Sequence, residues 1–140
     1  MRAVLVAILA SLPLMLLEAQ APAPASRSIR DGVYTTAQAR RGASLYSQYC
    51  GYCHGSDLLG LISSPPPLRG REFVSNWTDL RVGDLFERIR ISMPQDAPGT
   101  LPRQQNADIL AFIFQENGYP AGERELPIVD PLLSDIRIEP

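Results

Sequence analysis

The residues best suited to chemistry in this 140-residue sequence lie in one short run, Cys50-Gly51-Tyr52-Cys53-His54. Two thiols separated by two residues can each add to one vinyl group of a haem. A histidine directly after the second thiol can then reach the iron. The run therefore predicts one covalently attached haem c, held through Cys50 and Cys53, with His54 as the proximal iron ligand.

The same cysteine spacing also occurs in structural zinc sites, thioredoxin-like redox pairs and exported disulfides. Zinc would need further ligands, yet the chain has no other cysteine and no other histidine. A redox pair would follow a strand of a βαβ unit, whereas the residues before Cys50 favour a helix. A disulfide would leave His54 without a role. We therefore favour haem attachment over these three alternatives.

The second axial ligand follows by elimination. Haem iron in electron carriers takes a methionine or a histidine opposite the proximal histidine. His54 is the only histidine, and of the three methionines Met1 and Met15 lie in the amino-terminal leader. Met93 remains, and Pro94 disfavours helical backbone at Met93, so that its thioether can project toward the iron. The alternatives are that Met93 only fills the core or that the iron is five-coordinate.

Residues 1–25 are expected to be a signal peptide. Arg2 precedes an apolar run from Ala3 to Leu17, and a stretch of small residues and prolines follows up to Ala25. A retained membrane anchor is the alternative, but the run is shorter than the roughly 20 residues that a spanning helix needs. We expect a periplasmic protein that is soluble after export, with membrane anchoring only if the leader is retained.

A helix is expected to lead directly into the cysteines. The segment from Thr35 to Gln38 has the form of a capping box, and apolar or small residues then recur at helical spacing up to Tyr49. Gly42 lies in the middle of this helix, where glycine costs about 1 kcal/mol relative to alanine. A second helix that crosses closely at Gly42 would explain the residue, and simple tolerance of glycine is an equal reading.

Two more helices and two loops complete the expected fold. Residues from about Pro102 to Asn117 predict a second long helix, and residues 82–89 predict a shorter one that ends just before Met93. The proline-rich stretches Ser63 to Gly70 and Pro94 to Thr100 predict loops. These patterns indicate a small all-α domain with long loops, and a haem would fill its centre.

The haem motif, the later Met-Pro pair and the flanking helices resemble class I c-type cytochromes. Several segments are more narrowly similar to the single-haem cytochromes associated with quinoprotein alcohol dehydrogenases: Gly32-Val33-Tyr34-Thr35, Pro66-Pro67-Leu68-Arg69-Gly70, Asp84-Leu85-Phe86, Ser92-Met93-Pro94, Pro98-Gly99 and Asn117-Gly118-Tyr119-Pro120-Ala121-Gly122. The resemblance implies a small cytochrome c-like helical domain wrapped around one haem. It assigns residues 26–122 to the cytochrome c domain and residues 123–140 to a C-terminal extension.

The resemblance also implies roles for residues outside the cysteine motif. A backbone carbonyl of the proline loop, Pro66 or Pro67, would accept the proton of the proximal imidazole. Trp77 or Arg69 would bond a haem propionate, although a tryptophan in the core and an arginine on the surface are equally ordinary readings.

The expected function is electron transfer and not catalysis. With both axial positions occupied, the iron has no open position for a substrate. The expected partners are redox proteins, such as a quinoprotein dehydrogenase or an oxidase. Nucleic acid is excluded as a partner, because the net charge is −2 and no basic patch is interleaved with aromatic residues. The alternatives are a haem enzyme or gas sensor with a displaceable Met93, and a structural module held by a disulfide or a metal.

Overall fold

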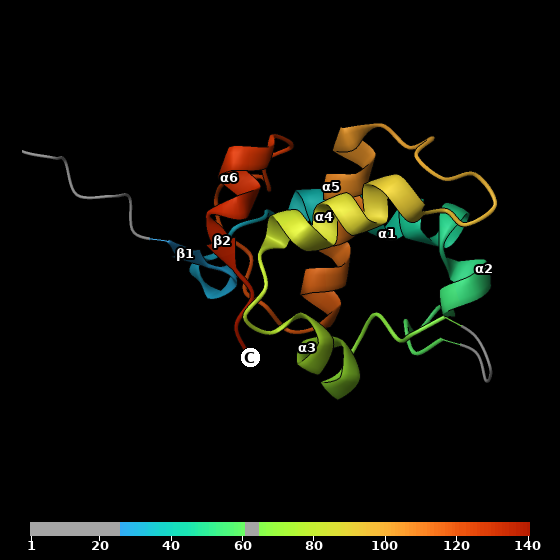
Figure 1. Ribbon diagram of the computed structural model, residues 1–140, viewed down its shortest axis with the longest axis horizontal. Coiled ribbons are helices and arrows are strands. Elements are labelled where there is room, and N and C mark those ends of the chain that lie inside the picture. Colours follow the sequence, from blue (N-terminus) through green and yellow to red (C-terminus); the bar gives the residue numbers. More distant parts are fainter. Residues whose placement is uncertain (1–25, 61–64) are drawn as a thin grey trace, which may run out of the picture.

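The computed structural model describes residues 26–60 and 65–140, so the predicted signal peptide lies outside the described residues. Within these ranges, no helix is both long and apolar enough to cross a membrane. The described chain is a small, mostly helical domain, as expected (Figure 1). Its elements in chain order are β1 Arg27–Ser28, η1 Ile29–Asp31, α1 Thr36–Tyr49, α2 Gly51–His54, α3 Arg71–Trp77, α4 Val82–Ser92, α5 Arg103–Glu116, α6 Asp130–Ser134 and β2 Ile136–Arg137.

The helix predicted to lead into the cysteines is confirmed as α1. Its N-cap, Thr35, accepts a hydrogen bond of 3.1 Å from the backbone N–H of Gln38. The second half of the capping box is not used, because the Gln38 side chain bonds the backbone of Leu126 at both its N–H and its carbonyl. The pattern at Thr35 therefore marks the helix start correctly, while Gln38 fixes a distant segment.

The two later helices also lie where the sequence places them. Helix α4 ends at Ser92, with Met93 as its C-cap, and α5 extends from Arg103 to Glu116. The two segments that were expected to be loops, one before α3 and one between α4 and α5, form turns and bends in the described residues 65–70 and 94–100. Both predicted loops are thus confirmed over the residues that the structure describes.

Helices α1 and α5 cross at Gly42, and the crossing explains why the residue is glycine. A Cβ atom at Gly42 would lie only 1.8 Å from the Asp108 carbonyl oxygen and 2.9 Å from the Cβ of Phe112. No side chain fits at that distance. The close-crossing reading of Gly42 is therefore confirmed over simple tolerance.

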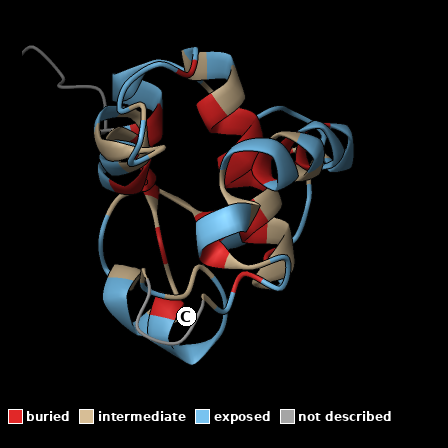
Figure 2. Ribbon diagram, turned by 90° about the vertical axis from the view of Figure 1, so that its right-hand side faces the viewer, coloured by how far each residue is buried: buried red, intermediate tan, exposed pale blue. Residues whose placement is uncertain are grey.

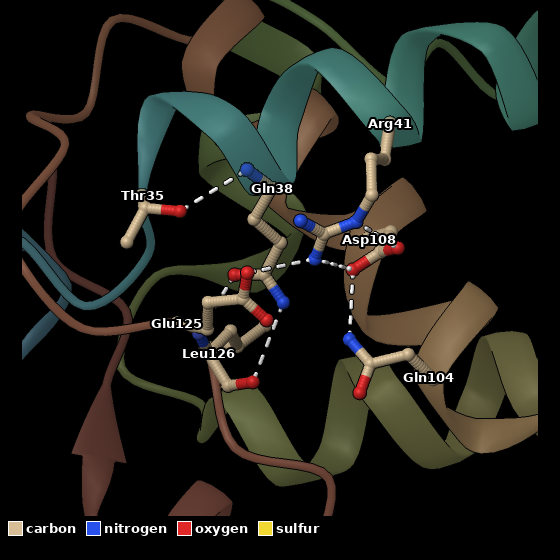
Figure 3. Close-up of polar contacts among 7 residues, drawn as sticks. All are labelled: Thr35, Gln38, Arg41, Gln104, Asp108, Glu125 and Leu126. Carbon is tan, nitrogen blue, oxygen red and sulfur yellow. Dashed lines mark hydrogen bonds and ion pairs between the residues drawn. The ribbon is translucent and has the colours of Figure 1, made fainter.

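Polar side chains tie the same two helices to the segment beyond residue 122 (Figure 3). Arg41 donates two hydrogen bonds of 2.9 Å to the Asp108 carboxylate, whose side chain is only 5% exposed, and a third of 2.9 Å to Glu125. Gln104 donates another to Asp108 at 2.9 Å. The buried carboxylate thus has both oxygens bonded, which is the condition under which a buried charge is tolerated.

Residues 123–140 pack into the same core as the helices. Leu126, Leu133, Ile136 and Ile138 are each at most 2% exposed. Strand β2 pairs in parallel with β1, which places Arg27 opposite Ile136. Figure 2 shows the buried residues along the facing sides of the elements and the exposed ones on their outer sides. The division at residue 122 stays a prediction, and in the structure both sides of it share one core.

Candidate haem-binding site

The cysteine motif forms a single helical turn directly after α1. Cys50 is the C-cap of α1 and precedes α2. The backbone N–H of Cys53 donates to the Cys50 carbonyl at 3.2 Å, and the N–H of His54 donates to the same carbonyl at 2.9 Å. The structure therefore brings Cys50, Cys53 and His54 together on one turn, as covalent attachment and axial ligation of one haem require.

The two cysteine side chains are thiols, one half-buried and one exposed. Burial raises the pKa of the Cys50 thiol to about 11, and the charge of Cys53 acts in the same direction. Redox-active cysteine pairs need a lowered thiol pKa, because the thiolate is the nucleophile. The Cys50 thiol is therefore unlike that of a thioredoxin-like pair. Among the described residues, no group of three or more His, Cys, Asp or Glu side chains could hold a metal ion.

The His54 imidazole is buried, with only 7% of the residue exposed. Burial lowers its pKa, and the backbone of Pro66 opposes this shift. Proline has no N–H, so the group that acts is the Pro66 carbonyl. The lowered pKa keeps the ring neutral near pH 7, which is the form that donates a lone pair to iron.

The second ring nitrogen of His54, Nδ1, is buried and makes no hydrogen bond with the residues that the structure describes. The Pro66 carbonyl acts on the ring as a hydrogen-bond acceptor would, since it raises the His54 pKa, but Nδ1 itself makes no hydrogen bond of ordinary geometry with it. A buried polar atom without a partner is unusual in a folded protein. It fits a ring whose final orientation is set by a bound haem, and the bond from Nδ1 to a proline carbonyl stays a prediction.

Asn117 fixes the proline loop beside His54, a role that the sequence reading did not foresee. Its side-chain amide donates to the Leu68 carbonyl at 2.9 Å, and its side-chain oxygen accepts from the Gly70 N–H at 3.0 Å. Leu68 also donates its N–H to the Leu58 carbonyl at 2.8 Å. The helix-stop signal at Asn117 was visible in the sequence, but its loop partners are 47 and 49 residues away.

Met93 has the extended backbone that the following proline predicts, with φ −125° and ψ 153°. Its N–H donates to the Ile89 carbonyl at 2.9 Å. Met93 is therefore held at the end of α4, where the backbone leaves the helix. The residue is half-buried. In Figure 1, the carboxyl end of α4 and helix α2 lie on the same, right-hand side of the molecule. Ligation of iron by Met93 stays a prediction.

The two residues considered for a haem propionate have other neighbours. Arg69 pairs with Glu116 at 3.3 Å and has 48% of its side chain exposed. Trp77 ends α3 and packs, partly buried, against the hydrophobic core. Both propionate roles stay predictions.

Comparison with known proteins gives one match. The model of the family described as "Cytochrome C oxidase, cbb3-type, subunit III" matches residues 37–113, which is more than half of the chain. The matched segment begins in α1, contains the cysteine motif and Met93, and ends in α5. No curated protein and no solved structure was found to match the chain.

Proposed function

Because the chain belongs to the cytochrome c family whose model describes subunit III of cbb3-type cytochrome c oxidase, we propose that it is a periplasmic electron carrier acting between a dehydrogenase and a terminal acceptor. Its cytochrome c domain makes it a haem-based electron carrier of the class I c-type group. Covalent haem c accords with the spacing of Cys50 and Cys53. Proteins of this family are typically electron carriers and not enzymes.

The observation that carries the proposal is the single turn that joins both thiols to a buried imidazole. Cys50 and Cys53 would hold the haem through thioether bonds, and His54 would supply a nitrogen ligand to its iron. Met93 would supply a sulfur ligand from the end of α4. When bound, haem c provides the redox chemistry, which is the gain and loss of one electron at the iron.

The residues that bind the iron would close it to substrates and set its reduction potential. With His54 and Met93 as its ligands, the iron would have no open position for a substrate, which favours electron transfer over oxygen or peroxide chemistry. A methionine opposite a histidine raises the reduction potential relative to two histidines. Such a potential suits a carrier that accepts electrons from a dehydrogenase and passes them to an oxidase.

The proposed partners are other redox proteins. The family description names an oxidase, and the loop segments that resemble cytochromes of quinoprotein alcohol dehydrogenases favour a quinoprotein as the electron donor. A carrier must leave after each transfer, so the contacts with these partners should be small and short-lived.

Ligand binding to the reduced holoprotein tests this function. After rapid mixing with carbon monoxide, an electron carrier with both axial positions filled should bind the gas slowly, at a rate independent of gas concentration when Met93 dissociation is limiting. A potentiometric titration of the same sample should fit a one-electron transition. Fast binding that rises linearly with carbon monoxide concentration would contradict the proposal and favour a haem enzyme or gas sensor.

A further inference from the structure

Tyr46 touches both ends of the turn that carries the haem-binding residues. It lies on α1, one helical turn before Cys50, and its backbone carbonyl accepts a hydrogen bond of 2.8 Å from the Cys50 N–H. Its side-chain hydroxyl donates a hydrogen bond of 2.7 Å to the carbonyl of Gly55, directly after His54. One residue thus fixes the turn where it begins and where it ends.

The Tyr46 ring lies near both α5 and the haem-binding turn. It is 5.3 Å, centroid to centroid, from the ring of Phe112 on α5. An added Cβ at Gly51 would lie 3.9 Å from a ring carbon of Tyr46, so the ring borders the haem-binding turn itself. The residue is only 2% exposed. The Tyr46 ring therefore links the haem-binding turn to helix α5.

Packing alone does not explain why residue 46 is a tyrosine and not a phenylalanine. A phenylalanine would fill the same space, and burying a hydroxyl costs free energy unless the group is hydrogen-bonded. Burial raises the pKa of the Tyr46 hydroxyl still further above neutral pH. The protonated hydroxyl therefore donates to the Gly55 carbonyl, which can only accept. Gly55 has φ +76°, and its carbonyl therefore points in a direction set by an uncommon backbone conformation.

We propose that Tyr46 is a positioning residue for His54. The Tyr46 hydroxyl holds the Gly55 carbonyl and thereby sets the orientation of the His54 imidazole toward the haem iron. The inference rests on the proposed function, because it assigns Tyr46 a role in axial ligation. The His54 carbonyl itself accepts a hydrogen bond of 2.9 Å from the Gly60 N–H. Two hydrogen bonds thus hold the backbone at the ligand and directly after it, and loss of one should let the ring rotate.

The test compares Tyr46→Phe with Tyr34→Phe in the holoprotein. Tyr34 is a matched control, since it is 1% exposed and its hydroxyl donates a 2.6 Å hydrogen bond to a backbone carbonyl, that of Tyr119, remote in sequence from the haem motif. Both variants keep their ring and lose one buried hydrogen bond. Both should therefore unfold at a somewhat lower denaturant concentration than the parent.

Only Tyr46→Phe should change the signals that report on His54. The haem methyl proton shifts of the oxidised protein depend on the plane of the axial imidazole, so we expect them to be redistributed in Tyr46→Phe and unchanged in Tyr34→Phe. The Gly60 amide should also exchange its proton faster in Tyr46→Phe alone. Unchanged methyl shifts and unchanged Gly60 exchange in Tyr46→Phe would overturn the inference, as would equal changes in both variants.

The parent protein separates this outcome from a failure of the proposed function. A parent that carries no covalent haem would overturn the proposed function and the inference together. A parent with haem and slow ligand binding, combined with an unaltered Tyr46→Phe spectrum, would leave the electron-carrier function in place and overturn only the role of Tyr46.

Discussion

At the scale of residues, the two proposed axial ligands reach their places by different local rules. His54 is fixed by its position after two cysteines on one helical turn. Met93 is fixed by the proline behind it, which ends α4 and gives Met93 an extended backbone. The first rule concerns five neighbouring residues and the second concerns a helix end, so the two ligands can be tested independently.

Replacing Met93 with alanine should open the distal side of the iron. The reduced variant should bind carbon monoxide many-fold faster than the parent, because no sulfur has to dissociate first. Met93→His should keep the haem attached and lower the reduction potential, since imidazole stabilises ferric iron better than a thioether does. Rapid-mixing kinetics and a potentiometric titration measure the two effects. An unaltered spectrum and ligand-binding rate in Met93→Ala would show that another group binds the iron.

The sequence predicts the proposed haem-binding residues but not all of the groups that support them. Cys50, Cys53 and His54 are predicted because a single local pattern contains their chemistry. The hydrogen bond from Tyr46 to Gly55 could not be predicted, because it depends on how the chain turns between them. The same holds for Asn117, whose loop partners are far away in the chain. A local pattern identifies a ligand, whereas the groups that orient the ligand emerge only from the fold.

At the scale of elements, the crossing of α1 and α5 sets the distance between the two helices. Gly42→Ala would place a methyl group where the Asp108 carbonyl oxygen lies, so the helices would have to separate. We expect a loss of about 1–3 kcal/mol in the free energy of unfolding, as is usual for overpacked sites. Denaturant unfolding of the holoprotein measures it.

Gly51→Ala is the matched control for this variant. Gly51 is also helical, but an added Cβ would lie no closer than 3.6 Å to another part of the chain, here the Tyr46 carbonyl oxygen. Alanine favours a helix over glycine by up to about 1 kcal/mol, so this variant should be neutral or slightly stabilised. Equal stability of Gly42→Ala and Gly51→Ala would contradict the close crossing.

The length of a helix or strand decides whether it can be predicted from the sequence. Helices α1, α4 and α5 are long enough for apolar residues to repeat over several turns, and all three are predicted close to their observed ends. Helices α3 and α6 have 7 and 5 residues, and each strand has 2, which is too short for a periodic pattern. These short elements form because the surrounding chain holds them, as the pairing of β1 with β2 across the whole sequence shows.

At the scale of the whole molecule, residues 123–140 close the core that the helices begin. Two neighbouring leucines on α6 test this contribution: Leu133 is fully buried and Leu132 is 54% exposed. Leu133→Ala should lower the free energy of unfolding by about 2–5 kcal/mol, because it leaves a cavity in the core. Leu132→Ala should change it by less than about 0.5 kcal/mol. Thermal unfolding of the two variants makes the comparison, and equal melting temperatures would show that the segment lies outside the core.

The central claim is that one haem is covalently bound through both Cys50 and Cys53. The most direct measurement is the pyridine haemochrome spectrum of the protein purified from an exporting host with a haem-attachment system. The spectrum should be that of a haem with both vinyl groups saturated, and the haem should remain with the protein after acid–acetone extraction. A protein without haem, or one whose haem is extracted with its vinyl groups intact, would contradict the account.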